Sequence, residues 1–139
     1  MQSLYHMKFS ALSALILAVL LAGSARAEDI VVIVNPASAP LSKEQIADIY
    51  LARNSTRTPI DQAAGSPIYT EFYKKATGYD VAQVKAIWSK ILFTGRGVPP
   101  KQLLDSEAVK KAVAANPKAV GYIEKSAVDD SVKVVMPLG

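Results

Sequence analysis

The chain has 139 residues, with 16 basic and 12 acidic side chains, one histidine and no cysteine. A chain of this length can enclose one hydrophobic core, and without cysteine it has neither disulfides nor thiolate chemistry. The basic residues are scattered, with no run longer than the pairs Lys74-Lys75 and Lys110-Lys111. A nucleic-acid groove needs clustered cations with exposed aromatic side chains, so we set that function aside.

Residues 1–27 have the pattern of a secretory signal peptide. Lys8 supplies a positive charge, residues 9–22 are apolar apart from two serines, and residues 25–27 form an A-x-A cleavage site. The apolar core is too short to span a bilayer, and the charge pattern and cleavage site argue against a buried N-terminal helix. Translation starts at the first methionine or at Met7. We therefore expect an exported protein, which is periplasmic if its source is Gram-negative.

Removal of the signal peptide leaves residues 28–139, with 14 basic and 12 acidic side chains and a net charge of +2. The only histidine, His6, is removed with it. Because neither histidine nor cysteine remains, histidine-based acid–base catalysis, cysteine nucleophiles and zinc sites are excluded. Asp129-Asp130 reads as a solvated turn rather than a catalytic carboxylate pair. We expect no enzyme, no metal and no cofactor.

The exported part opens with a strand and a capped helix. Residues 30–34 are five β-branched residues before an Asn-Pro turn, which is typical of a strand covered on both faces. Ser42 to Gln45 form a capping box for a helix that ends near Ala52. The following residues, 53–65, read as a loop with a short strand around 58–61.

Three further helices and two strands are expected. The helices start at the caps Ser66, Asp80 and Ser106, and the strands span 120–123 and 132–136. Gly78 closes the first of these helices. Trp88 and Leu92 lie on the inward apolar stripe of the second, so Trp88 is interpreted as a core residue rather than a ligand platform. The order β-α-(β)-α-α-α-β-β predicts one α/β domain over residues 28–139.

One part of the sequence gathers hydrogen-bond donors densely. The Gly-Arg-Gly loop at 95–97 offers backbone N–H groups and one guanidinium together, which suits an anion. Ligands of α/β sheets gather at the carboxyl ends of strands, where helix starts add partial positive charge. The candidate ligand-binding residues are Gly65, Ser66, Thr94, Gly95, Arg96, Gly97 and Ser106. Either these elements converge on one anion or each serine only caps its own helix, and the spacing alone favours the second interpretation.

Three motifs follow one another in residues 28–139. They are a valine-rich strand and L-S-x-x-Q-I-x-x-I-Y-L helix over 30–51, F-T-G-R-G-V-P-P at 93–100, and N-P-K-A-V-G-Y-I at 116–123. Together they resemble the phosphate-type periplasmic substrate-binding proteins of ABC importers. The resemblance covers nearly all of residues 28–139. It implies a single lobe of a type II periplasmic-binding-protein fold, with a central sheet flanked by about four helices. Full-length members close two such lobes around the anion.

The resemblance places the anion-binding helix start of the family, an arginine followed by Ser-Gly-Thr, at Asp61 to Ser66. Gly65 and Ser66 keep the small end of that motif, but the stretch has no arginine and Asp61 would repel an anion. Arg96 is the candidate replacement.

Two functions stay open at this point. The chain is either a non-enzymatic binding protein for phosphate or another small anion, or an accessory or sensory module that kept the fold, lost the ligand and binds another envelope protein. One lobe buries little of a ligand, so tight binding would require a homodimer or docking onto a partner such as an ABC permease.

Overall fold

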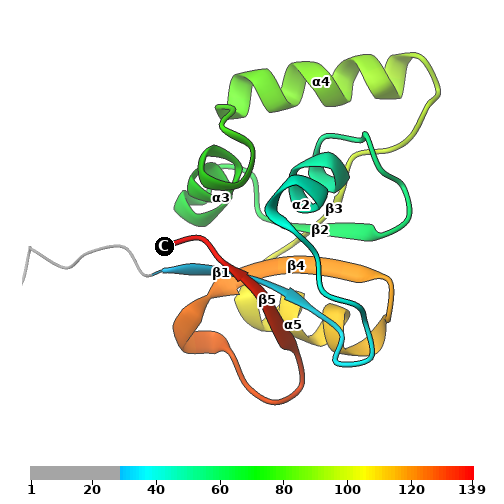
Figure 1. Ribbon diagram of the computed structural model, residues 1–139. Helices are drawn as coiled ribbons and strands as arrows, with labels where there is room; N and C mark the ends of the chain where they lie inside the picture. Colours follow the sequence, from blue (N-terminus) through cyan, green and yellow to red (C-terminus); the bar gives the residue numbers. More distant parts are fainter. Residues whose placement is uncertain (1–28) are drawn as a thin grey trace, which may run out of the picture.

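The computed structural model describes residues 29–139, so the expected signal peptide lies outside the described residues. The elements are β1 (Ile30–Val34), α2 (Lys43–Tyr50), β2 (Thr58–Gln62), α3 (Pro67–Thr77), α4 (Val81–Phe93), β3 (Lys101–Leu103), α5 (Ser106–Ala115), β4 (Ala119–Glu124), a 3₁₀ turn (Lys125–Ala127) and β5 (Lys133–Pro137). The strands form one sheet in the order β3-β2-β4-β1-β5. Helices α2, α3 and α4 lie on one side of this sheet and α5 on the other (Figure 1). The predicted α/β class, a sheet flanked by four helices, is confirmed.

Strand β1 lies inside the sheet and is covered on both faces, as its sequence predicts. It pairs antiparallel with β4 and with β5, and all five of its residues are buried. Alternate side chains of a strand point to opposite faces. Ile30, Val32 and Val34 therefore join the core under α2 and α3, whereas Val31 and Ile33 join the core under α5.

Helix α5 sits directly on β4 because Gly121 has no side chain. A β-carbon at this position would lie 2.6 Å from Val109 Cγ1 and 3.1 Å from Val113 Cγ2. Close backbone approach of this kind is a usual reason for glycine inside a strand. The N-P-K-A-V-G-Y-I segment therefore has a structural role, in which Asn116 ends the helix and the strand follows at once.

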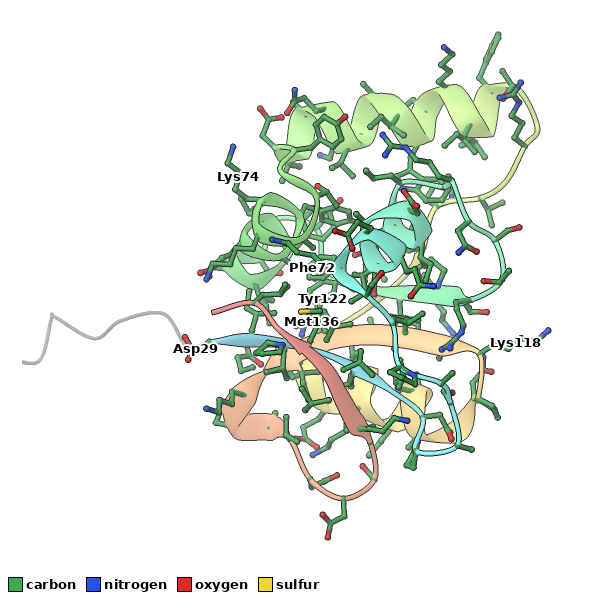
Figure 2. The ribbon with its side chains drawn as sticks, viewed as in Figure 1. Asp29, Phe72, Lys74, Lys118, Tyr122 and Met136 are labelled. Carbon is green, nitrogen blue, oxygen red and sulfur yellow. The ribbon has the colours of Figure 1, made fainter. Side chains whose placement is uncertain are left out.

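Aromatic rings fill the opposite face of the sheet. Tyr50, Phe72 and Tyr122 are fully buried, and Phe72 stacks on Tyr122 with ring centroids 3.8 Å apart and planes within 3° (Figure 2). The Tyr50 hydroxyl lies 2.8 Å from the carbonyl oxygen of Ile60 and 3.1 Å from that of Val120. One phenol thus links α2 to two neighbouring parallel strands, β2 and β4.

Several predicted helix ends are confirmed atom by atom. Both capping boxes, at Ser42 and at Asp80, have their two reciprocal hydrogen bonds. Ser66 caps α3, and Gly78 ends it in the left-handed conformation. The short strand expected near 58–61 is β2.

Three features differ from the sequence-based expectation. The strand β3 pairs in parallel with β2, although its three residues carry no apolar run that would have predicted it. Leu92, expected to face inward, is 54% exposed, because α4 is the outermost helix and packs on α3 (Figure 1). The cap of α5 is Asp105, whose side chain accepts from the Ala108 N–H, and Ser106 is already the first helical residue.

Two clefts as candidate functional sites

A cleft of about 500 Å³ opens at the carboxyl ends of β2, β3 and β4, where α3 and α5 begin. It is lined by Ile30, Gln62, Ser66, Pro67, Ile68, Glu71, Leu104, Asp105, Ser106, Glu107 and Glu124, and we call it the acidic cleft. Ligands of α/β sheets bind at such a place. The structure thus brings the two candidate serines together, while Gly65 lies in the exposed turn just before the lining.

The charge of the acidic cleft opposes an anion. Four carboxylates line it, and none of the lining residues is a lysine or an arginine. Glu71 and Glu107 each have a lysine ammonium partner, at 2.7 Å and 3.1 Å. Asp105 and Glu124 instead accept hydrogen bonds from the first turn of α5. A phosphate in this cleft would therefore meet an excess of negative charge.

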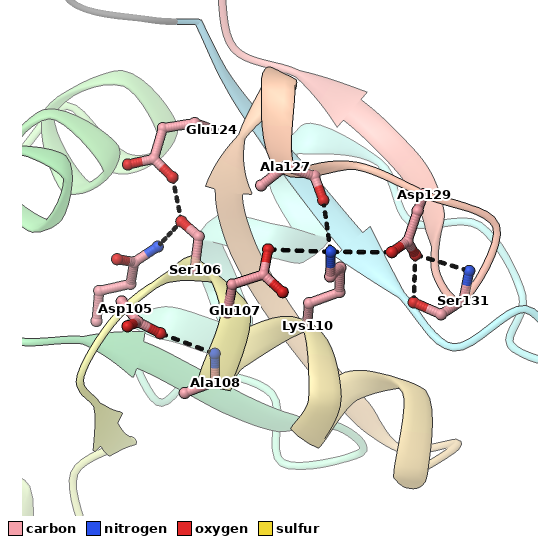
Figure 3. A network of polar contacts seen from close by, with 10 residues as sticks. Asp105, Ser106, Glu107, Ala108, Lys110, Glu124, Ala127, Asp129 and Ser131 are labelled. Atoms are coloured by element: carbon pink, nitrogen blue, oxygen red, sulfur yellow. Dashed lines mark hydrogen bonds and ion pairs between the residues drawn. The ribbon is translucent and has the colours of Figure 1, made fainter.

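The donors of the acidic cleft are already used inside the protein. Gln62 Nε2 donates to Ser106 Oγ at 2.9 Å, and the Ser106 hydroxyl in turn donates to Glu124, as Figure 3 shows. The Ser66 hydroxyl donates to the carbonyl of Ala63 at 2.7 Å. Each serine hydroxyl has only one proton to donate, so neither is free for a ligand in this arrangement.

A second polar cluster, centred on Lys110, lies beside the acidic cleft and links the loop before β5 to α5 through hydrogen bonds and ion pairs. Lys110 Nζ lies 2.9 Å from Asp129, 3.1 Å from Glu107 and 3.0 Å from the carbonyl oxygen of Ala127 (Figure 3). Hydrogen bonds from Ser131 and then from Lys110 lower the pKa of the Asp129 carboxyl to about 2. The hydrogen bonds to Asp129 and Glu107 raise the pKa of Lys110. The ammonium of Lys110 and the carboxylates of Glu107 and Asp129 form ion pairs with one another, so we interpret the cluster as structural.

The Gly-Arg-Gly loop contributes to a different cleft. This cleft, of about 410 Å³, is lined by Ile49, Ala52, Asn54, Ser55, Arg57, Thr58, Pro59, Trp88, Ile91, Arg96, Gly97, Val98, Pro99, Pro100 and Lys101. We call it the basic cleft, because three of these residues are cationic and none is acidic. It shares no lining residue with the acidic cleft. The three donor-rich elements singled out in the sequence therefore do not converge, and Thr94 and Gly95 lie in the exposed turn that ends α4.

The three cations of the basic cleft have no counter-charge. Arg57, Arg96 and Lys101 form no salt bridge within residues 29–139, whereas nearby Arg53 pairs with a carboxylate at 3.6 Å. Arg57 Nη2 donates to the carbonyl of Ala39 at 3.0 Å, and its Nη1 is buried without a hydrogen-bond partner among the described residues. Arg57 therefore supplies positive charge, and the exposed guanidinium of Arg96 is the one that can hold a carboxylate or phosphate through two hydrogen bonds.

Asp61 does not line the acidic cleft, contrary to the expectation that it would repel an anion near Ser66. Its carboxylate is buried and accepts hydrogen bonds from Tyr73 at 2.8 Å and from Tyr122 at 2.9 Å. Burial raises the pKa of Asp61 to about 7, although both hydrogen bonds act to lower it. Burial, together with the charge of Asp61, also raises the pKa of both tyrosines, so they remain donors.

Arg57 and Lys101 are not among the residues that the sequence singles out, although a simple signal points to their surroundings. Residues 81–104 hold four basic side chains and no acidic one, a charge imbalance that a search for basic runs overlooks. Trp88 is half-buried: its Nε1–H donates to the carbonyl of Tyr50 at 3.0 Å, and the residue lines the basic cleft.

Solved structures of the same fold provide the comparison. An ABC-type phosphate transport receptor from Vibrio cholerae matches with 18% identity and a TM-score of 0.57, over 78% of this chain and 46% of that one. A phosphate-bound protein from Clostridium perfringens, assigned as a phosphate ABC transporter substrate-binding protein, matches with 23% identity and a TM-score of 0.61, over 78% and 44%. PstS from Borrelia burgdorferi matches with 11% identity and a TM-score of 0.57, over 78% and 46%.

These matches show the fold. The resemblance to phosphate-type substrate-binding proteins is thereby confirmed at that level, and this chain spans less than half the length of the three structures. No protein-family model and no curated protein matches the chain. Among the described helices, none has the length and hydropathy needed to cross a membrane.

Proposed function

We propose that this protein is an exported, non-enzymatic binding protein that holds a small anion, such as phosphate, in its basic cleft. The observation that carries the proposal is the group of three cations, Arg57, Arg96 and Lys101, which line one cleft without a counter-charge. The fold shared with phosphate receptors supports a binding role. Arg96 and Gly97 are the residues of the Gly-Arg-Gly loop that would contact the anion.

The acidic cleft is the competing location, because it occupies the carboxyl ends of the parallel strands. Its four carboxylates and its internally bonded serines argue against an anion there. An anion could enter it only if Ser66 and Ser106 released their present acceptors and the carboxylates were neutralised. We therefore assign the anion to the basic cleft and keep Ser66 and Ser106 as the residues to test against it.

A thermal-shift titration separates these locations. Phosphate, sulfate, molybdate and simple carboxylates are added to the purified protein, and an anion at about a hundred times its Kd should add about 2.7 kcal/mol of stability. We expect Arg96→Ala to abolish the shift, and Arg53→Ala, the matched control outside the cleft, to retain it. A shift lost in Ser66→Ala but kept in Arg96→Ala would place the anion in the acidic cleft. No shift with any anion at millimolar concentration would refute anion binding.

A second candidate function is an interaction module, and the end of α4 favours it. Leu92, Phe93 and Val98 are 54%, 92% and 74% exposed and lie close together in the sequence. Apolar side chains gathered on a surface often mark a contact with another protein. An envelope protein such as an ABC permease, or a second copy of this chain, would cover them.

Cross-linking and sedimentation test this second function. Phe93→Ser should abolish a specific cross-link to an envelope protein, or a homodimer in sedimentation, whereas Leu104→Ser should not. Leu104 is the matched control, since it is 82% exposed but lines the acidic cleft. Equal cross-linking and equal sedimentation of the Phe93→Ser and Leu104→Ser variants would count against an interface at the end of α4.

A further inference from the structure

The walls of the basic cleft contain more apolar surface than a phosphate ion needs. We propose that its ligand is an organic anion, in which a carboxylate or phosphate group is attached to an aromatic or branched apolar group. This inference rests on the proposed function, since it assumes that an anion binds in the basic cleft, and it specifies the chemical class of that anion.

The apolar wall comes from α4 and from the segment that follows it. Trp88 and Ile91 of α4 line the cleft together with Val98 and the two following prolines, whereas Ile49 of α2 is only 1% exposed and adds almost no surface to the wall. Small-molecule sites are mostly apolar clefts of roughly 300–1,000 Å³ with a few polar groups that fix orientation. At about 410 Å³ the basic cleft falls in this range. A small oxyanion would fill only part of the cleft and would leave its apolar wall exposed to water.

The cations supply the orienting groups. Arg57 lies just before β2, Arg96 lies in the segment between α4 and β3, and Lys101 is the first residue of β3. Because no carboxylate lines the cleft, their charge is available to a ligand headgroup. The exposed Arg96 guanidinium can form two parallel hydrogen bonds to a carboxylate or a phosphate. An anion held there would lie beside an apolar wall on which its organic part can pack.

The same wall offers a probe, because Trp88 is the only tryptophan in the chain. The purified protein is titrated with phenyl phosphate, inorganic phosphate and the neutral benzyl alcohol, with the fluorescence of Trp88 recorded and calorimetry run in parallel. Phenyl phosphate and inorganic phosphate share a headgroup, so their difference reports the apolar wall. We expect phenyl phosphate to bind roughly tenfold or more tightly than inorganic phosphate, since burial of a phenyl ring exceeds the free energy of one decade in affinity.

Variants locate the two halves of the site. Arg96→Ala should weaken the binding of both phenyl phosphate and inorganic phosphate. Ile91→Ser should weaken the binding of phenyl phosphate alone, and Arg53→Ala should change the affinity for neither. Equal affinities for the two phosphates, both lost in Arg96→Ala, would overturn this inference and leave the proposed function standing. Binding of benzyl alcohol as tight as that of phenyl phosphate would overturn the role of the cations. Failure of every ligand by both methods would overturn the inference and the proposed anion binding together.

Discussion

Asp61 should make the stability of this protein fall as the pH rises toward neutrality. Its pKa is about 7 in the folded protein and about 3.9 in an unfolded chain. Between these values the folded state holds a proton that the unfolded state has released, so the free energy of unfolding decreases with rising pH. A difference of about three pKa units corresponds to about 4 kcal/mol, which is a large share of the roughly 5–15 kcal/mol that stabilises a typical domain.

The variant Asp61→Asn removes the titrating group and keeps its shape. Urea unfolding is followed by the fluorescence of Trp88 from about pH 4.5 to 8.5. As the pH rises toward the folded-state pKa of Asp61, the free energy of unfolding of the variant should increase relative to that of the wild type by up to about 4 kcal/mol. Residues 28–139 contain no histidine, so no imidazole titrates in the same range. A companion variant, Tyr73→Phe, removes a hydrogen bond that lowers the pKa of Asp61 and should move the loss of stability to higher pH.

Parallel pH profiles for wild type and Asp61→Asn would refute this account of the buried carboxyl. A difference that grows toward low pH would have the wrong sign and would mean that Asp61 is stabilised as an anion.

Three further predictions concern packing, hydrogen bonding and export. Gly121→Ala should cost about 1–3 kcal/mol in urea unfolding, because its β-carbon would overlap Val109; an unchanged midpoint would mean that α5 can shift outward freely. Tyr50→Phe should cost about 1–3 kcal/mol by removing the one buried hydroxyl proton that the carbonyls of Ile60 and Val120 share, and an unchanged value would indicate that water replaces the hydroxyl. Mass spectrometry of the periplasmic fraction should find a chain that begins at Glu28, whereas an intact N-terminus there would contradict signal cleavage.

Much of the fold is predictable because its signals are local. The β-branched run of β1, the capping box at Ser42 and the glycine at position 78 each determine a neighbouring turn of chain with little help from the rest. The strand β3 is different, because Lys101–Leu103 becomes a strand only through pairing with β2, about 40 residues earlier. Nothing within those three residues contains that information.

The candidate site also has features that follow from the sequence and features that depend on tertiary packing. The meeting of Ser66 and Ser106 follows from a general rule, since both lie after parallel strands and at helix starts. The separation of Arg96 from them depends on where α4 packs, which is a tertiary property. Two of the four carboxylates of the acidic cleft, Glu71 and Glu124, likewise come from separate elements, and the sequence does not indicate that they lie close together.

The position of β1 inside the sheet has a consequence for how the chain folds. Its partners in β4 and β5 lie between 86 and 106 residues further along. When β1 leaves a ribosome or a translocation pore, it therefore has no partner until nearly all the described residues have followed. Contacts at such sequence separations make folding slow. For the export that we propose, slow closure of the sheet would keep the chain unfolded long enough to cross a membrane before its core forms.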